Sequence, residues 1–335
     1  MNLVKKSILI FFILISISNL YAGVGLDNFE FLNKNNNRLL KGIILYPSDE
    51  KSDKTFAENI AFKGFEAKKN ALIKKEKSPL IVFTHGTSGN WKNQSWLAAK
   101  LASIGYIVIA ANHPGYTTGD SSASTVLKMW NQPKDVSFML DSILKSKYKN
   151  FIDTDKIYTL GLSLGGYTSM ALTGAKLDMK SLKSFCSKHD DISCRYFKKA
   201  YSILDNDFYK ESSKDYKDER VKASIAIAPG LVPFMTNDSL KKIDKPVLVL
   251  GAEFDKNVPV KTQILPKVDS FSKSIIYGDI KDSSHFSFLQ ICKKGAKKIL
   301  EEEDASFVCN DGNKKTRQTI HKEVYNKVVN FLNNL

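Results

Sequence analysis

A serine stands between two glycines in the segment Gly161-Leu162-Ser163-Leu164-Gly165. The segment directly follows the apolar run Ile157-Tyr158-Thr159-Leu160 and precedes the helix-compatible residues 166–171. A sharp strand-to-helix turn of this kind exposes the serine hydroxyl, and the flanking glycines let the strand and helix backbones approach closely. The pattern therefore predicts that Ser163 is a catalytic nucleophile.

A serine hydroxyl is a weak nucleophile until a neighbouring base takes its proton, so the chemistry requires a histidine. We expect this base to be His285, which follows the apolar run 275–277. Its place after the serine fits the order serine, acid, histidine that accompanies this kind of turn. The other histidines precede the serine, lie in a polar insert or belong to the terminal helix pattern: His85, His113, His189 and His321.

The acid that orients the histidine is expected after another strand. The apolar run 247–250 is followed by Gly251-Ala252-Glu253-Phe254-Asp255, whereas the preceding run ends in Ala228-Pro229-Gly230 and offers no acid. We predict Asp255 as the acid, with Glu253 as the close alternative. The carboxylate would hold the histidine in its neutral tautomer and stabilise the charged form during turnover.

Negative charge that develops on an acyl oxygen needs preorganised hydrogen-bond donors, each contributing about 3 kcal/mol. We expect one donor to be the backbone N–H of Leu164, the residue after the nucleophile. The second should come from the loop 84–90, which follows the apolar run 80–84, and we assign it to the N–H of Thr87. His85, in the same loop, is predicted to be a structural hydrogen-bonding residue rather than a second base.

These residues must be held by regularly alternating elements. Short, nearly continuous apolar runs suit strands buried on both faces of a parallel sheet, and helical patterns separate them. The alternation predicts the α/β class, with a doubly wound, mostly parallel sheet whose ligands bind at the carboxyl ends of the strands. Segments 29–32 and 43–46 are expected to form an antiparallel edge. The expected strands are 80–84, 107–111, 157–160, 224–228, 247–250 and 275–277, and the expected helices include 96–103, 136–144 and 320–331.

An aromatic-rich insert, residues 175–220, separates the helix after the nucleophile from the next strand. Two interpretations are open: a cap whose aromatic side chains line an acyl pocket, or an insert packed against the outside of the sheet. His85, His113 and Tyr116 are further candidates to border the pocket.

The N-terminus predicts export. Lys5-Lys6 precedes the apolar run 8–17, and Leu20-Tyr21-Ala22 follows it, as in a secretory signal peptide cleaved near Ala22. The run is shorter than the roughly 20 residues of a membrane span. The alternative is an uncleaved anchor; a lipid anchor is not expected, because the first cysteine is Cys186. We therefore expect a leader over 1–22 and one domain over 23–335 in a periplasmic or secreted protein.

Export makes the four cysteines candidates for disulfides. Three pairings are possible. We expect the local ones, Cys186 with Cys194 and Cys292 with Cys309, because both pairs fall in polar, loop-like sequence. Metal-ligand spacings are missing from the sequence, so no metal site is predicted.

The composition limits the remaining classes. A chain of 335 residues with 43% hydrophobic residues can bury a large core and is neither disordered nor collagen-like. Its net charge of +15, which becomes +13 without Lys5 and Lys6, comes from lysines interleaved with glutamates. Such a surface does not predict a nucleic-acid groove, although weak attraction to anionic lipid headgroups or acidic substrates stays open. No cofactor is expected, and the sequence does not indicate an oligomeric state.

Six groups of residues along the chain carry a resemblance to known proteins. They are His85-Gly86-Thr87-Ser88-Gly89, Asn112-His113-Pro114-Gly115, Pro133-Lys134-Asp135-Val136 with Leu140-Asp141, Gly161 to Gly166, Ala228-Pro229-Gly230 and His285-Phe286-Ser287-Phe288-Leu289. Together these segments resemble the α/β-hydrolase superfamily and, more narrowly, look like bacterial predicted dienelactone-hydrolase-type proteins related to platelet-activating-factor acetylhydrolases. True dienelactone hydrolases use a cysteine nucleophile, so Ser163 here does not predict lactone hydrolysis.

The resemblance implies a metal-free serine esterase with the triad Ser163, Asp255 and His285 and backbone donors at Thr87 and Leu164. We therefore predict an exported hydrolase of carboxylic esters, with a short-acyl or lipid-like substrate and an acyl-enzyme intermediate. A serine peptidase or amidase with the same triad is the alternative within enzymes. A non-catalytic, hydrolase-like binding protein is the alternative outside them.

Overall fold

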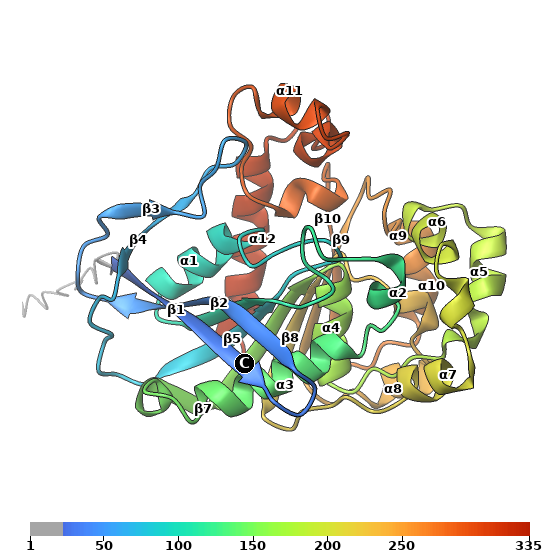
Figure 1. The fold of residues 1–335 in the computed structure, drawn as a ribbon, viewed down its shortest axis with the longest axis horizontal. Coiled ribbons are helices and arrows are strands. Elements are labelled where there is room, and N and C mark those ends of the chain that lie inside the picture. Colours follow the sequence, from blue (N-terminus) through green and yellow to red (C-terminus); the bar gives the residue numbers. More distant parts are fainter. Residues whose placement is uncertain (1–22) are drawn as a thin grey trace, which may run out of the picture.

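The computed structural model describes residues 23–335, so the predicted leader 1–22 lies outside the described residues. One sheet with the strand order β10-β9-β8-β7-β5-β6-β2-β1-β4-β3 forms the centre of the molecule (Figure 1). Strands β5 to β10 are parallel to one another, and β2 is antiparallel to both β6 and β1. The strands are β1 (Gly23–Asn33), β2 (Arg38–Ser48), β3 (Lys54–Phe56), β4 (Phe65–Lys69), β5 (Ser78–Thr84), β6 (Ile107–Asn112), β7 (Ile152–Leu162), β8 (Val221–Ile227), β9 (Val247–Ala252) and β10 (Ile275–Ile280).

Helices separate and follow the parallel strands. The α-helices are α1 (Ser95–Ser103), α2 (Ala123–Val126), α3 (Asn131–Ile143), α4 (Leu164–Leu172), α5 (Leu182–Lys188), α6 (Ile192–Lys198), α7 (Asn206–Ser212), α8 (Asn237–Lys242), α9 (Val260–Gln263), α10 (Leu265–Val268), α11 (Ala296–Glu301) and α12 (Arg317–Asn333). The 3-10 helices are η1 (Lys149–Phe151), η2 (Met179–Ser181), η3 (Tyr201–Ile203), η4 (Val232–Phe234), η5 (His285–Phe288) and η6 (Ser306–Cys309). In the part of the chain from 23 to 335, none of these helices has the length and apolar character needed to cross a bilayer.

Two helical layers cover the parallel strands, as the alternation predicts. Helices α1 and α12 pack on one face, where they form a common core with side chains such as Ile81 and Val108. Helices α3 and α4 lie on the other face, and α3 packs there against Leu80 and Val82. The doubly wound, mostly parallel sheet expected from the sequence is therefore present.

Helix α3 shows how an apolar stripe fixes one of these helices. Its side chains Val136, Met139, Leu140 and Ile143 are all fully buried, since their spacing puts them on one face. A stripe of this width faces the sheet, whereas Lys134 and Asp141 on the opposite face are exposed. The predicted helix is confirmed, although it begins five residues earlier than the apolar pattern, at Asn131.

The expectation that the first two strands form the sheet edge is wrong. Strands β1 and β2 are antiparallel, but β4 pairs with β1 in parallel and β3 pairs with β4, so β3 is the edge. Both added strands are short and rich in charged residues, which hides them from an apolar pattern. Only the alternation of buried Phe65, exposed Glu66 and buried Ala67 marks β4 as a strand.

Both local disulfides form as expected, Cys186–Cys194 and Cys292–Cys309. The first pair lies in helices α5 and α6 rather than in loops. Helix α6 begins in polar sequence because the carboxylate of Asp191 accepts the N–H of Cys194 at 2.8 Å, which caps its first turn. Figure 1 shows α5, α6 and α7 grouped at one side of the molecule, with α11 at the top of the view.

Candidate active site

Ser163 lies in the turn that joins strand β7 to helix α4. Its backbone has φ +58° and ψ −117°, a conformation that a residue with a side chain rarely adopts. The end of β8 holds this turn from both sides: the N–H of Ser163 donates to the carbonyl of Ile227, and its carbonyl accepts the N–H of Gly230, each at 2.9 Å. The surrounding structure thus maintains the strained turn predicted from the glycine-flanked serine.

The glycines beside the serine leave no room for a side chain. A Cβ built on Gly161 would lie 2.0 Å from the carbonyl oxygen of Gly165, and one on Gly165 would lie 2.0 Å from the carbonyl oxygen of Thr84. Strand, turn and helix therefore approach more closely than any residue with a Cβ allows. This close approach brings the loop after β5 against the serine.

His285 and Asp255 contact each other at the ends of neighbouring parallel strands. Nδ1 of His285 lies 2.6 Å from Oδ2 of Asp255, and both residues are buried. The other carboxylate oxygen of Asp255 accepts the backbone N–H groups of Asn257 and Val258, each at 2.8 Å. The carboxylate is thus fixed by its own loop, and Nε2 of the histidine is left for another partner.

Glu253, the alternative acid, points elsewhere. Its carboxylate accepts the backbone N–H of Asp282 at 2.8 Å and lies 3.6 Å from the ammonium group of Lys281. It therefore supports the turn after β10, and the carboxylate that contacts His285 belongs to Asp255.

One cavity of about 340 Å³ collects the residues expected to act on a substrate. Ser163, Leu164, Thr87 and His285 all line it, as the carboxyl ends of β5, β7 and β10 meet at one edge of the sheet. The rest of its wall is mainly apolar and aromatic. It includes Phe185, Ile192, Tyr196, Phe197, Leu231, Phe234, Val258, Phe286 and Phe307.

The two backbone donors expected for an oxyanion are free for a ligand. No hydrogen bond among residues 23–335 uses the N–H of Thr87 or that of Leu164. The loop that carries Thr87 touches the nucleophile, because a Cβ on Gly86 would lie 2.9 Å from Cβ of Ser163. Thr87 and Leu164, which carry these N–H groups, both line the cavity that holds Ser163.

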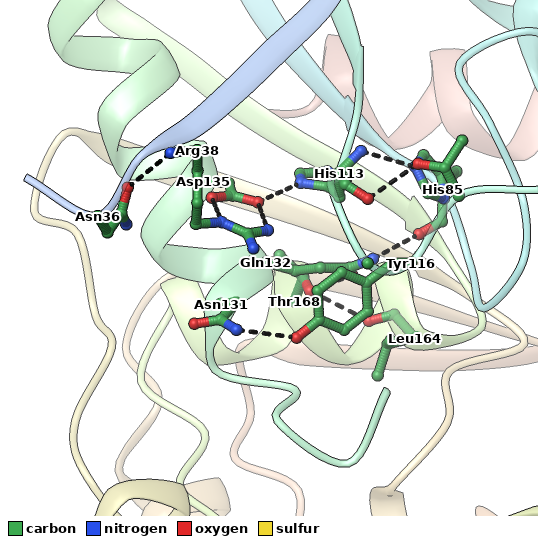
Figure 2. Close-up of polar contacts among 12 residues, drawn as sticks. Asn36, Arg38, His85, His113, Tyr116, Asn131, Gln132, Asp135, Leu164 and Thr168 are labelled. Carbon is green, nitrogen blue, oxygen red and sulfur yellow. Dashed lines mark hydrogen bonds and ion pairs between the residues drawn. The ribbon is translucent and has the colours of Figure 1, made fainter. Parts of the chain in front are cut away.

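His85, His113 and Tyr116 do not border this cavity, contrary to expectation. All three side chains are buried behind the loop after β5, in a polar cluster shown in Figure 2. Tyr116 donates its hydroxyl to the carbonyl of Lys128 at 2.5 Å, which turns the hydroxyl away from the cavity. Nδ1 of His113 lies 3.0 Å from the carboxylate of Asp135, whereas its buried Nε2 has no hydrogen-bond partner within residues 23–335.

His85 has the structural role expected for it. Nδ1 of its ring lies 2.8 Å from the carbonyl of Gly86, and Nε2 accepts the backbone N–H of His113 at 3.1 Å. Burial, reinforced by the nearby His113 ring, lowers the pKa of His85 to about 3, so the ring is neutral at physiological pH. With Nε2 accepting, the remaining proton is on Nδ1 and is donated to Gly86.

A buried ion pair extends this cluster to the first hairpin of the sheet. Arg38 of β2 binds the carboxylate of Asp135 with two N–H groups, at 2.7 and 2.6 Å, and Nδ1 of His113 lies 3.0 Å from the same carboxylate. Burial alone would raise the pKa of Asp135, but its contacts with Arg38 and His113 outweigh burial and lower it. Asp135 is therefore ionised and joins three segments that are distant in sequence.

The insert 175–220 forms part of the pocket wall. Phe185 from α5 and Phe197 from α6 both line the cavity, which favours the cap interpretation over an insert packed on the outer side of the sheet. A buried side chain ties the insert to the core: Gln263 of α9 donates to the carboxylate of Asp191 at 2.8 Å. The same carboxylate caps α6, so the cap and the loop after Asp255 are linked.

A second wall comes from a segment that sequence reasoning missed. Phe307, in the excursion between η5 and α12, lines the cavity, and its ring centroid lies 5.2 Å from that of Phe286. The Cys292–Cys309 disulfide closes this excursion two residues beyond Phe307. The disulfide was the available signal, because a closed loop beside the histidine must lie near the site.

Known proteins resemble this chain at three levels. A family model described as "alpha/beta hydrolase fold" matches residues 79–191, which include the nucleophile turn. The cutinase est1 of Thermobifida alba is 23% identical over 212 residues, covering 62% of this chain and 53% of that protein, so the chain matches about half of the relative's length. The structure of a ferulic acid esterase from Streptomyces cinnamoneus superposes with a TM-score of 0.62 at 16% identity, covering 95% of this chain and 91% of that one.

These comparisons bear on the fold. The superposition includes nearly the whole chain, but at 16% sequence identity it shows a shared fold and nothing about activity. The narrower resemblance to dienelactone-hydrolase-type proteins stays a prediction. Together with the strand order and the turn at Ser163, the family model and the structural neighbour show that this chain has the α/β-hydrolase fold.

Proposed function

We propose that this protein is an exported serine hydrolase that cleaves carboxylic esters through an acyl-enzyme. The observation that carries the proposal is the single cavity in which Ser163, His285 and the free N–H groups of Thr87 and Leu164 meet, with Asp255 2.6 Å behind the histidine. Nucleophile, base, orienting acid and oxyanion donors are the complete set of groups that acyl transfer needs.

In the proposed reaction, Nε2 of His285 takes the hydroxyl proton as Oγ of Ser163 attacks the ester carbonyl. The carbonyl oxygen becomes negative and binds the N–H groups of Thr87 and Leu164, while Asp255 stabilises the charged imidazole. The C–O bond of the ester then breaks, and the histidine gives its proton to the departing alcohol. Water, deprotonated by the same histidine, releases the acid and restores the serine.

The substrate class follows from the pocket wall. An apolar cavity of about 340 Å³ lined with aromatic side chains suits a short acyl chain or a compact aromatic acyl group. The related proteins described as a cutinase and a ferulic acid esterase both point to ester substrates rather than amides. The basic excess of the chain would attract acidic esters or anionic headgroups, an attraction that salt screens.

Export is part of the proposal. Two disulfides among the described residues suit an oxidising compartment, and the predicted leader over 1–22 supplies the route.

A fluorophosphonate probe tests the proposal directly. It should label the wild-type protein at Ser163, and the variant Ser163→Ala should lose both labelling and hydrolysis of p-nitrophenyl esters. Folded wild-type protein that remains unlabelled would instead support a hydrolase-like binding protein. Faster cleavage of peptide anilides than of matched esters would support a peptidase and contradict the ester assignment.

A further inference from the structure

One buried amide side chain connects the two segments that carry the proposed oxyanion donors. Gln132, in the first turn of α3, contacts the loop that holds Thr87 on one side and helix α4, which begins at Leu164, on the other (Figure 2). We propose that Gln132 is a positioning residue that sets the spacing between these two backbone N–H groups. The inference rests on the proposed function, since it assigns a residue to the oxyanion site of that reaction.

The orientation of the Thr87 N–H is fixed through the carbonyl of the preceding residue. The Gly86 carbonyl accepts the N–H of the His85 ring at 2.8 Å and the backbone N–H of Gly89 at 3.1 Å. Because a trans peptide is planar, the N–H of Thr87 must point opposite to that carbonyl. Two bonds that hold the Gly86 carbonyl inside the loop therefore direct the Thr87 N–H the other way, toward the cavity that Thr87 lines.

Gln132 holds the residue on which this arrangement depends. Its amide nitrogen donates to the backbone carbonyl of His85 at 3.2 Å. The ring of His85 is held separately by the N–H of His113, at 3.1 Å. With both its backbone and its ring bound, His85 has one position from which to bind the Gly86 carbonyl.

The oxygen of the same amide reaches helix α4. It accepts the hydroxyl of Thr168 at 2.9 Å, and this hydroxyl also lies 3.1 Å from the carbonyl of Leu164, one turn earlier. Thr168 therefore contacts the start of α4 at Leu164, a residue that lines the cavity. One rigid amide, a donor at one end and an acceptor at the other, spans the two halves of the oxyanion site.

Helix α3 holds the backbone of Gln132 in a fixed position. Gln132 and Asp135 stand three residues apart on α3, and both are essentially unexposed. The carboxylate of Asp135 binds Arg38 of β2 and His113 beyond β6, which anchors the start of the helix to the sheet. The spacing of the two donors is therefore set by groups that do not touch the substrate.

The test compares Gln132→Leu, which removes both contacts, with Thr168→Val, which removes only the contact to α4. Displacing a donor without deleting it should lower kcat for a p-nitrophenyl ester by roughly 10- to 100-fold in Gln132→Leu, with KM within about twofold of wild type. Asn131→Leu is the matched control: it removes a neighbouring amide of α3 that binds the Tyr116 hydroxyl at 3.2 Å and not the loop, so kcat should stay within about twofold.

A second measurement distinguishes a displaced oxyanion donor from a general loss of rigidity in the variant. Sulfur accepts hydrogen bonds more weakly than oxygen, so wild type should hydrolyse an ester faster than the matching thionoester, and Gln132→Leu should reduce that preference. An unchanged kcat and an unchanged preference in the folded variant would overturn the proposal. If Gln132→Leu fails to fold, Thr168→Val is read by the same two criteria. Wild type that cleaves neither ester would overturn the proposed function and, with it, this inference, whereas active wild type with unaffected variants overturns the inference alone.

Discussion

At the scale of single residues, the candidate site depends on which atom of Asp255 faces His285. One carboxylate oxygen is occupied by the N–H groups of Asn257 and Val258, and the other contacts the ring. An acceptor at that second position requires Nδ1 of the histidine to carry its proton. Nε2 is then unprotonated and able to receive the proton of Ser163.

Asp255→Asn should therefore reverse the tautomer. The backbone N–H groups of Asn257 and Val258 would still bind the side-chain oxygen of the new asparagine. Its NH₂ group then faces Nδ1 of His285 and donates to it, so the ring proton moves to Nε2. We expect kcat to fall by about 10⁴-fold with little change in folding, measured with p-nitrophenyl esters and a thermal melt. Glu253→Gln is the matched control and should retain activity within about twofold. The reverse pattern would move the acid to Glu253.

At the scale of elements, the active residues come from the sheet and the pocket wall comes from outside it. Ser163, Asp255 and His285 follow β7, β9 and β10, whereas Phe197 and Phe307 belong to two segments that each contain a disulfide. The reacting groups and the pocket wall therefore belong to different parts of the fold. A change in the wall segments should leave the reacting groups largely in place.

Replacing both Cys186 and Cys194 by serine tests this separation. The pair closes a loop with a sequence separation of 8, so its loss should lower the free energy of unfolding by about 2.5 kcal/mol. Helices α5 and α6 would lose their covalent cross-link. KM for a long-chain ester should therefore rise severalfold, which lowers its kcat/KM, while kcat/KM for an acetate ester stays near the wild-type value. Urea unfolding and a chain-length series measure the two effects. Equal losses for both esters would show that the cap also holds the reacting groups.

The elements differ in how far the sequence predicts them. The parallel strands and the stripes of α3 and α12 were accessible because burial on a sheet forces apolar periodicity. Strand β4 could not be predicted in this way, because it is a strand through its pairing with β1 and its composition gives no apolar pattern. In the same way, Ser163 and His285 follow from local pattern and chain order, but no spacing rule brings Gln132 to His85, which depends on how α3 packs. Contacts between distant segments are tertiary and leave no local signal.

At the scale of the whole molecule, two buried histidines link folding to pH. Burial lowers the pKa of His85 to about 3; at His321 burial, together with the nearby charges of Arg317 and Lys100, has the same result, from a usual value of 6.5. His321 donates Nε2–H to the carbonyls of Ser287 and Leu289 at 3.1 and 2.9 Å. Both rings stay neutral in the folded chain at a pH where the unfolded chain protonates them.

The unfolded state therefore binds more protons between pH 6.5 and about 3, so stability is greatest above 6.5 and falls as the pH falls through this window. Each histidine contributes up to about 1.4 kcal/mol per pH unit. Urea titrations at pH 7, 6 and 5 should show this decline. His321→Gln keeps an N–H donor for the two carbonyls and should reduce the slope by about half. A free energy of unfolding that stays constant from pH 7 to 5 would contradict the burial of neutral rings.

The two disulfide-containing segments around the cavity have a consequence for how such a protein diversifies. The first is inserted between α4 and β8 and the second follows β10, so neither supplies a strand of the sheet, and their lengths and sequences can vary more readily than those of β7, β9 or β10. Selection for a new substrate would then act on these two segments first. Proteins descended from one such ancestor would be expected to catalyse the same reaction and to differ in the substrates that their cavities accept.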